Sequence, residues 1–285
     1  MGPVSPAREG CGGFSDLSKG AVLQCVEAGT LGMPFEVWKT RMGRYRNENT
    51  VQAFKHIYQR GGVSAYWQGL SAKLVESATK GAIFLYSKET LFEGMRCLNF
   101  SETTSGFVAG AGGGICQTAV MGPCTYIVTA LVTGTNMKSE AVTDKIRQVW
   151  RTRGIRGLYS GSSAIAFRQA TNWASRQGFT EFARAKMKQG DETRKLTKRQ
   201  EICAGIIGGT LSTWNQPFEV ARIHMQAAAN QGRPSQSLPE AFVCIVRENG
   251  PSALFKGIVP RIGLGIWQTL FMVTGAKLLR DSFGW

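Results

Sequence analysis

Histidine is scarce in this sequence, and its cysteines form no recognisable pairs. Only His56 and His224 are present, and the seven cysteines include neither a CxxC motif nor a zinc-like spacing with histidine. A histidine-based metal centre and a catalytic triad are therefore not expected. The odd number of cysteines argues against a closed set of disulfides. With no nucleophile elbow or phosphate-binding loop either, the sequence predicts a protein that is not an enzyme and uses no metal or cofactor.

Long apolar segments are missing as well. No stretch of about 20 residues has the leucine and isoleucine content that marks an obvious membrane-spanning helix. Two segments nevertheless carry no charge at all, residues 103–137 and 202–218, and both are rich in Gly, Ala, Thr and Ile. Such segments can span a membrane when one face lines a water-filled cavity. Composition alone leaves a soluble helical protein open as the alternative.

The N-terminal segment lacks the features of a targeting peptide. Residues 1–16 hold one Arg, one Glu, one Asp and no apolar run, which is typical of neither a secretory signal nor an Arg-rich transit peptide. We expect a flexible N-terminus over residues 1–15, and any targeting information within the rest of the chain.

Negative charge is in short supply. The chain has 34 Lys and Arg against 19 Asp and Glu, a formal net charge of +15. Such an excess implies a partner of opposite sign, which could be nucleic acid, anionic lipid or a small anionic substrate.

What the sequence does contain is a threefold repeat. Pro34, Pro123 and Pro217 are spaced by 89 and 94 residues, and each follows a Gly-containing, weakly apolar stretch. Each proline is followed 28 to 33 residues later by a second element, Gly-x-x-x-x-aromatic-x-Gly, which ends at Gly69, Gly161 or Gly257. Short amphipathic segments lie between the two elements, and a segment of about 20 residues follows. Three copies in register indicate six long helices and three short surface helices.

The residues after Pro34 resemble the signature of the mitochondrial carrier family. Pro34-Phe35-Glu36-Val37-Trp38-Lys39-Thr40-Arg41 matches P-x-[DE]-x-x-[KR]-x-[KR] without a mismatch, and Pro217-Phe218-Glu219-Val220-Ala221-Arg222 repeats its core. The resemblance covers the chain from about Asp16 onward. It implies an all-α membrane protein with six transmembrane helices in a pseudo-threefold bundle, divided into repeats at 16–100, 101–195 and 196–285. Within the family, the degenerate second motif is similar to that of the fungal citrate/2-oxoglutarate carriers.

The resemblance also implies a gate on the matrix side. In the family, the acid of each odd-numbered helix pairs with the base of the next, around helices bent by proline. Here Thr125 and Val128 replace the acid and base of the second repeat, so Glu219 and Lys39 are left as the one complete pair. Glu36 would face Val128 and Arg222 would face Thr125, with Gln226 as a brace. The predicted gate residues are Pro34, Glu36, Lys39, Pro123, Pro217, Glu219, Arg222 and Gln226.

A second, cytoplasmic gate is implied on the even-numbered helices. Positions 20 and 23 residues after the closing glycines carry charges of both signs that could pair between helices. The candidates are Glu89, Glu181, Arg184, Lys277 and Arg280.

Carriers bind cargo on the even-numbered helices, seven and eight residues after the closing glycine. That rule selects Glu76 on the second helix and Arg168 with Gln169 on the fourth, with Lys80 one turn beyond Glu76 and Arg261 as a third anchor. In the family an Arg-Gln pair marks carboxylate and 2-oxo acid cargo. A guanidinium can bind a carboxylate bidentately, while the amide can donate to a carbonyl or hydroxyl. Glu76 and Lys80 could instead form only an intrahelical pair, and Glu27 has no assignable partner.

The predicted function is therefore antiport of citrate against 2-oxoglutarate across the mitochondrial inner membrane, by alternating access. The expected protein is a monomer whose other partner is membrane lipid, including cardiolipin. Two alternatives remain open from the sequence: another anionic cargo, such as a nucleotide or amino acid, and a membrane-associated DNA-binding role in the nucleoid. The second would use the Lys- and Arg-rich residues 186–199.

Overall fold

The computed structural model describes residues 21–98, 100, 102–134, 142–188, 196–234 and 236–283, and the predicted flexible N-terminus lies outside them. Within this part of the chain the regular structure is helical, with no strand. Residues 21–27 are helical and lead into the next element. The elements then follow in the order η1 (Ala28–Gly32), α2 (Met33–Arg44), α3 (Thr50–Gly61), η2 (Gly62–Trp67), α4 (Leu70–Cys97), α5 (Glu102–Cys116), α6 (Thr118–Thr133), α7 (Val142–Leu158), α8 (Ser162–Lys188), α9 (Lys198–Leu211), η3 (Ser212–Asn215), α10 (Gln216–Asn230), α11 (Leu238–Asn249), η4 (Pro251–Phe255) and α12 (Ile258–Phe283).

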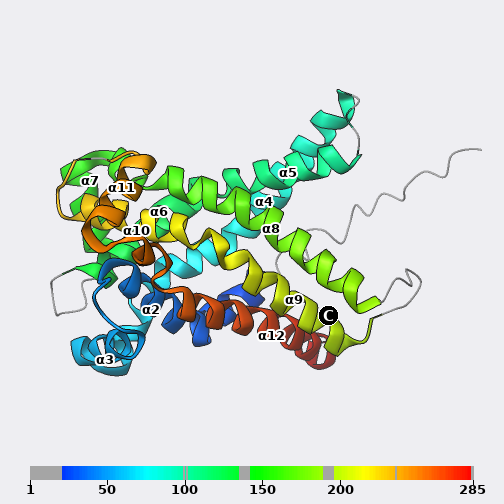
Figure 1. Ribbon diagram of the computed structural model, residues 1–285, viewed down its shortest axis with the longest axis horizontal. Coiled ribbons are helices and arrows are strands. Elements are labelled where there is room, and N and C mark those ends of the chain that lie inside the picture. The colour runs from blue at the N-terminus through cyan, green and yellow to red at the C-terminus, as the bar shows by residue number, and fades with distance from the viewer. Residues whose placement is uncertain are drawn as a thin grey trace, which may run out of the picture.

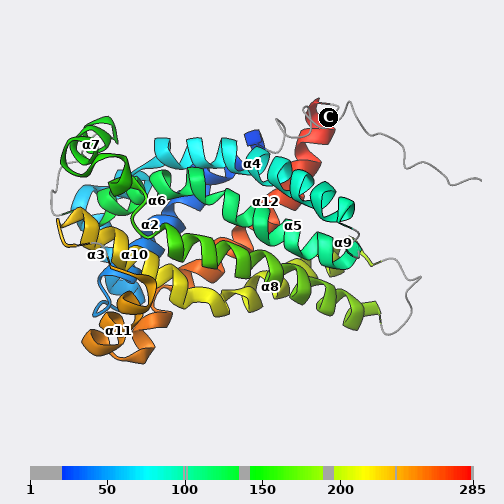
Figure 2. The ribbon, with the colours of Figure 1, turned by 90° about the horizontal axis from the view of Figure 1, so that it is seen from above.

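The same arrangement occurs three times along the chain. A broken helical segment comes first (21–44, 102–133 and 198–230), then a short helix (α3, α7 or α11), then one long unbroken helix (α4, α8 or α12). The short helices gather at one end of an elongated bundle, as Figures 1 and 2 show from two directions. The long segments run along its length (Figure 2).

Proline removes a backbone donor from the first helical segment of each unit. In the second unit it lies inside α6, and the break falls earlier in the chain, between Cys116 and Thr118. Before Pro34 the helix widens to π geometry over Ala28–Gly32, and the carbonyl of Gly29 accepts a bond from the Trp67 indole N–H at 2.8 Å. In the second unit, Pro123 frees the carbonyl of Ala119, which accepts the Tyr159 hydroxyl at 2.9 Å. The aromatic residue of the second repeated element therefore satisfies the backbone group that proline leaves unpaired.

The closing glycines join neighbouring units. Gly69, Gly161 and Gly257 have φ values of 82°, 79° and 81°, a left-handed region that favours glycine. A Cβ on Gly69 would lie 3.1 Å from Val128, one on Gly161 would lie 3.3 Å from the carbonyl oxygen of Arg222, and one on Gly257 would lie 3.2 Å from that of Lys39. Each glycine thus packs on the first helix of the next unit, and the third packs back on the first. The three units close into a ring.

The turn after α2 is stabilised by ionic contacts on Glu48. Its carboxylate accepts from the Arg41 guanidinium at 2.8 and 2.6 Å, and it lies 2.9 Å from Nδ1 of His56. Burial alone would raise the pKa of Glu48, but the hydrogen bonds from Arg41 and His56 outweigh it and hold the pKa below its usual range. These contacts join α2 to α3.

Hydropathy identifies few of these helices. By length and apolar content, none of the described helices qualifies alone as a membrane span. One pair does so when taken together, Val108–Cys116 with Thr118–Thr133, which are bent by 45°.

Candidate functional site

A polar cavity of about 220 Å³ lies between the long helices. Among the described residues, seven cationic side chains and three carboxylates line it: Lys39, Lys73, Lys80, Arg168, Arg176, Arg222 and Arg261 against Glu36, Glu76 and Glu219. This is smaller than the roughly 300–1,000 Å³ of pockets for drug-sized ligands. Its size and its excess of positive charge suit a small anion with more than one negative charge.

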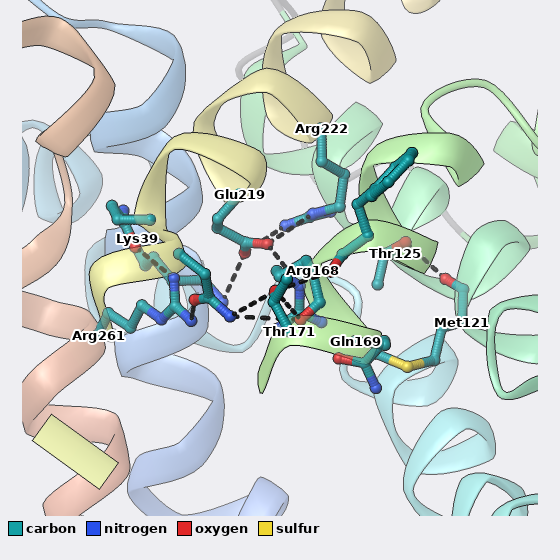
Figure 3. Close-up of polar contacts among 12 residues, drawn as sticks. Lys39, Met121, Thr125, Arg168, Gln169, Thr171, Glu219, Arg222 and Arg261 are labelled. Carbon is teal, nitrogen blue, oxygen red and sulfur yellow. Dashed lines mark hydrogen bonds and ion pairs between the residues drawn. The ribbon is translucent and has the colours of Figure 1, made fainter. Parts of the chain in front are cut away.

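At one end of the cavity, three cations surround the carboxylate of Glu219 (Figure 3). Lys39 lies 2.9 Å from it, Arg222 2.8 Å, and Arg168 3.2 Å. Lys39 also lies 2.9 Å from Glu36 on its own helix. We call Glu36, Lys39, Arg168, Glu219 and Arg222 the Glu219 cluster. It joins α2, α8 and α10 through charges that are almost fully buried.

The sequence-based expectation for these charges is met in part. The ion pair between Glu219 and Lys39 is present. Glu36, however, which was expected to face Val128, makes its ion pair within its own helix, three residues away. The contact of Arg168 with Glu219 was not anticipated, because nothing in a linear motif relates α8 to α10.

On the side of α6, where the acid and base are replaced, hydrogen bonds to uncharged side chains take the place of ion pairs. Arg222 donates to Oε1 of Gln226 at 2.7 Å and to the hydroxyl of Thr129 at 3.3 Å. Gln226 Nε2 donates to Thr125 at 3.2 Å, so Arg222 reaches Thr125 through the glutamine. The brace role foreseen for Gln226 fits these contacts. Thr129, whose exposed fraction is 0%, was missed, although it lies one turn after Thr125 on the same helix face.

Apolar packing joins α6, α7 and α10 at the end of the bundle where the short helices gather. A group of buried apolar residues from α6, α7 and α10 fills this end: Tyr126, Ala130, Val149, Leu158 and Ala229. These contacts attach the short helix α7 to α6 and α10.

All five predicted cargo residues line this one cavity: Glu76, Lys80, Arg168, Gln169 and Arg261. The Arg261 guanidinium donates to Gln216 at 2.8 Å and to the side-chain oxygen of Asn215. Gln169 donates to Gln117 at 2.8 Å. The structure thus brings together residues from α4, α8 and α12 that lie far apart in sequence.

The alternative left open for Glu76, an intrahelical ion pair with Lys80, is not what the structure shows. The ion-pair partner of Glu76 is Lys73, at 3.1 Å, three residues earlier rather than four later. Glu76 is 1% exposed, and its second carboxylate oxygen has no hydrogen-bond partner among the described residues. Lys73 was missed, although its spacing to Glu76 is one that places two side chains on the same helix face.

Glu27 is buried next to the two lysines of α4 that line the cavity. Its polar neighbours are Lys73, Lys80 and Gln268, and its exposed fraction is 5%. The sequence had assigned it no partner.

Arg184, a candidate for the second gate, pairs with a residue outside the even-numbered helices, and its predicted pairing with the other gate candidates stays a prediction. It lies 2.8 Å from Glu201 of α9, in an exposed ion pair, whereas pairing among the even-numbered helices was expected. Glu89 is exposed and makes no ion pair with another described residue. The side chains of Glu181, Lys277 and Arg280 lie outside the described residues.

Comparisons with known proteins agree with this arrangement of repeats and charges. The family model "Mitochondrial carrier protein" matches three segments, residues 13–96, 100–191 and 195–284. The chain belongs to the mitochondrial carrier family.

Among its relatives, the "Citrate/oxoglutarate carrier protein" of Saccharomyces cerevisiae is 36% identical over 94% of this chain and 90% of the relative. The "Tricarboxylate transport protein B, mitochondrial" of Danio rerio is 27% identical over 76% of this chain and 70% of the relative. The "Mitochondrial 2-oxodicarboxylate carrier 2" of S. cerevisiae is 28% identical over 76% of this chain and 72% of the relative.

Proposed function

We propose that this protein is a multi-pass antiporter of the mitochondrial inner membrane that exchanges citrate for 2-oxoglutarate by alternating access. The observation that carries the proposal is the cationic cavity around Arg168 and Gln169. The relatives named as citrate/oxoglutarate and tricarboxylate carriers support the same cargo class.

The distribution of polarity supports a membrane location for the six long segments. Charged side chains such as Glu27, Glu76 and Arg222 are at most 5% exposed, whereas Val75, Phe167 and other large apolar side chains of the long helices are more than half exposed. In water this arrangement would be unfavourable, because it exposes apolar surface and buries charge. In a bilayer it is favourable, since the apolar exteriors face lipid and the charges line the interior. It also accounts for the low hydropathy of each segment.

The balance of charge in the cavity supports a polyvalent anion as cargo. Three carboxylates can neutralise only three of the seven lining cations, which leaves a net positive site for di- and tricarboxylates. Arg168 and Arg261 approach from α8 and α12, and a guanidinium can bind a carboxylate through two parallel hydrogen bonds.

Arg168 links the cargo site to the gate. Its Nε lies 3.2 Å from Glu219 but makes no hydrogen bond in the described structure, so the contact is electrostatic and its N–H remains available. A cargo carboxylate that binds Arg168 competes with Glu219 for this guanidinium. Glu219 then keeps Lys39 and Arg222 as partners, and α8 is released from α10. Binding of cargo would thereby weaken the closed gate, which is the differential interaction that alternating access requires.

Exchange by reconstituted protein tests the proposal. Liposomes containing the purified protein are preloaded with citrate, 2-oxoglutarate, malate or ATP, and uptake of labelled citrate is measured. We expect uptake into vesicles loaded with citrate or 2-oxoglutarate. Exchange with ATP alone would refute the cargo assignment.

A paired substitution tests the site. Arg168→Ala should abolish uptake while the protein stays folded. Arg151→Ala, which removes an exposed arginine of α7 outside the cavity, serves as the matched control and should transport normally. Normal uptake by Arg168→Ala would exclude this residue as the cargo anchor.

A further inference from the structure

The bend between α5 and α6 places a buried glutamine against the cargo site. Gln117 is 4% exposed, lines the cavity, and makes three hydrogen bonds. Its Nε2 donates to the backbone carbonyl of Lys80 at 2.9 Å, while its Oε1 accepts from Gln169 at 2.8 Å and from the Trp173 indole at 3.4 Å. Gln117 therefore joins α4 to α8.

The chemistry of two of these partners fixes the orientation of the Gln117 amide. A backbone carbonyl can only accept and an indole N–H can only donate, so Nε2 must face Lys80 and Oε1 must face Trp173. The ring of Trp173 is itself held by stacking on Phe84, with ring centroids 4.0 Å apart. The orientation of the Gln117 amide thus follows from its partners. It does not rely on telling the amide oxygen from the amide nitrogen by position alone.

The fixed oxygen of Gln117 in turn orients Gln169. Because Oε1 of Gln117 can only accept, the NH₂ group of Gln169 must point toward it. The amide oxygen of Gln169 accepts no hydrogen bond from the described residues, although this side chain lines the cavity. One N–H of Gln169 is therefore used within the protein, and its oxygen remains for the cargo. The second N–H of Gln169 donates to none of the described residues, so the donor role suggested by the sequence stays compatible with this geometry, and the free oxygen adds an acceptor.

We propose that Gln117 is a positioning residue that makes Gln169 a hydrogen-bond acceptor for a hydroxyl group on the cargo. The inference rests on the proposed carboxylate transport and names the feature of the cargo that the site recognises. A carboxylate or a 2-oxo oxygen offers no hydrogen to this acceptor, whereas the hydroxyl of a hydroxy acid does. The site therefore favours hydroxylated carboxylates over analogues that lack the hydroxyl.

Citrate and tricarballylate form a matched pair for the test, because tricarballylate is citrate without its hydroxyl and has the same three carboxyl groups. Relative affinity is measured in two ways: from inhibition of labelled citrate uptake into liposomes, and from ligand-induced stabilisation of the purified protein in detergent. A variant that binds without transporting still reports through the second. In the unsubstituted protein, citrate should bind about threefold to tenfold more tightly, the range that one net hydrogen bond supplies.

Gln117→Leu removes the group that holds Gln169, so the citrate preference should fall below about twofold, with both ligands still bound. Gln117→Glu loses the hydrogen bond to the Lys80 carbonyl but keeps an oxygen that accepts from Gln169 and Trp173, so it should retain the preference. Its added charge affects both tricarboxylates alike and cancels in the ratio. Gln268→Leu removes a different cavity amide, one next to Glu27, and should leave the ratio unchanged.

The results separate this inference from the proposed function. If the unsubstituted protein exchanges citrate but binds tricarballylate equally well, or if Gln117→Leu keeps the full preference, the positioning role is refuted and carboxylate transport stands. If no carboxylate is exchanged at all, the proposed function itself is wrong.

Discussion

Neutralising Glu219 tests whether the Glu219 cluster behaves as a network or as a simple ion pair. Glu219→Gln leaves Lys39, Arg222 and Arg168 without their shared carboxylate. Removing one partner of a buried ion pair costs about 3–5 kcal/mol. At about 2 °C per kcal/mol for a chain of this size, the midpoint of thermal unfolding should fall by about 6–10 °C.

Exchanging the two charges distinguishes the models more sharply. For an isolated pair, combining Lys39→Glu with Glu219→Lys would restore the interaction. In this structure the new acid at 39 would lie beside Glu36, and the new base at 219 would lie between Arg222 and Arg168. The double variant should therefore be no more stable than the less stable single one.

The assay is thermal unfolding of purified protein in detergent, followed by the fluorescence of its seven tryptophans. Glu201→Gln is the matched control, because it removes a carboxylate from the exposed ion pair with Arg184. Exposed pairs contribute about 0–1 kcal/mol, so the control should shift the midpoint by no more than about 2 °C. A double variant with the stability of the unsubstituted protein would refute the network.

Three further predictions concern the repeat framework and the turn after α2. Gly161→Ala should lower the unfolding midpoint by about 2–4 °C, because a side chain at φ 79° costs about 1–2 kcal/mol. The added Cβ would also crowd the carbonyl oxygen of Arg222. An unchanged midpoint would contradict this prediction. Tyr159→Phe should cost about 1–3 kcal/mol by leaving the Ala119 carbonyl unpaired, and a variant as stable as the parent would show that the bond is dispensable. Glu48, whose pKa is held below its usual range, contributes stability above the usual carboxyl pKa that is lost as the pH falls through the lowered value. Glu48→Gln should therefore flatten the acid side of the stability profile, and an identical pH dependence would remove this role.

Short-range features of the chain could be predicted from sequence because they depend on spacing within one helix. The prolines lie shortly after the breaks, because proline removes a backbone donor, and the closing glycines mark the turns into the long helices, because glycine tolerates a positive φ. Lys39 and Glu219 could be paired in advance because the repeated motif, read through the family resemblance, relates equivalent positions in different repeats. The family followed from the same residues, and the cargo class followed from Arg168 and Gln169 through that resemblance.

Contacts between helices at positions that the repeated motif does not relate could not be predicted in this way. Arg168 reaches Glu219, and Gln117 reaches both Lys80 and Gln169, only because of how α4, α6, α8 and α10 are rotated and spaced in the bundle. A linear pattern fixes which residues share a face of one helix, but it does not fix which face of a neighbouring helix they meet.

The sequence by itself thus determined the repeated helices, their breaks and the types of charge available in this protein. Tertiary structure alone decided that seven of the cations share one cavity and that the amide oxygen of Gln169 accepts no hydrogen bond from the described residues. The physical reason is that hydrogen-bond polarity and charge neutralisation depend on partners brought together by packing, and those partners lie dozens of residues apart in the chain.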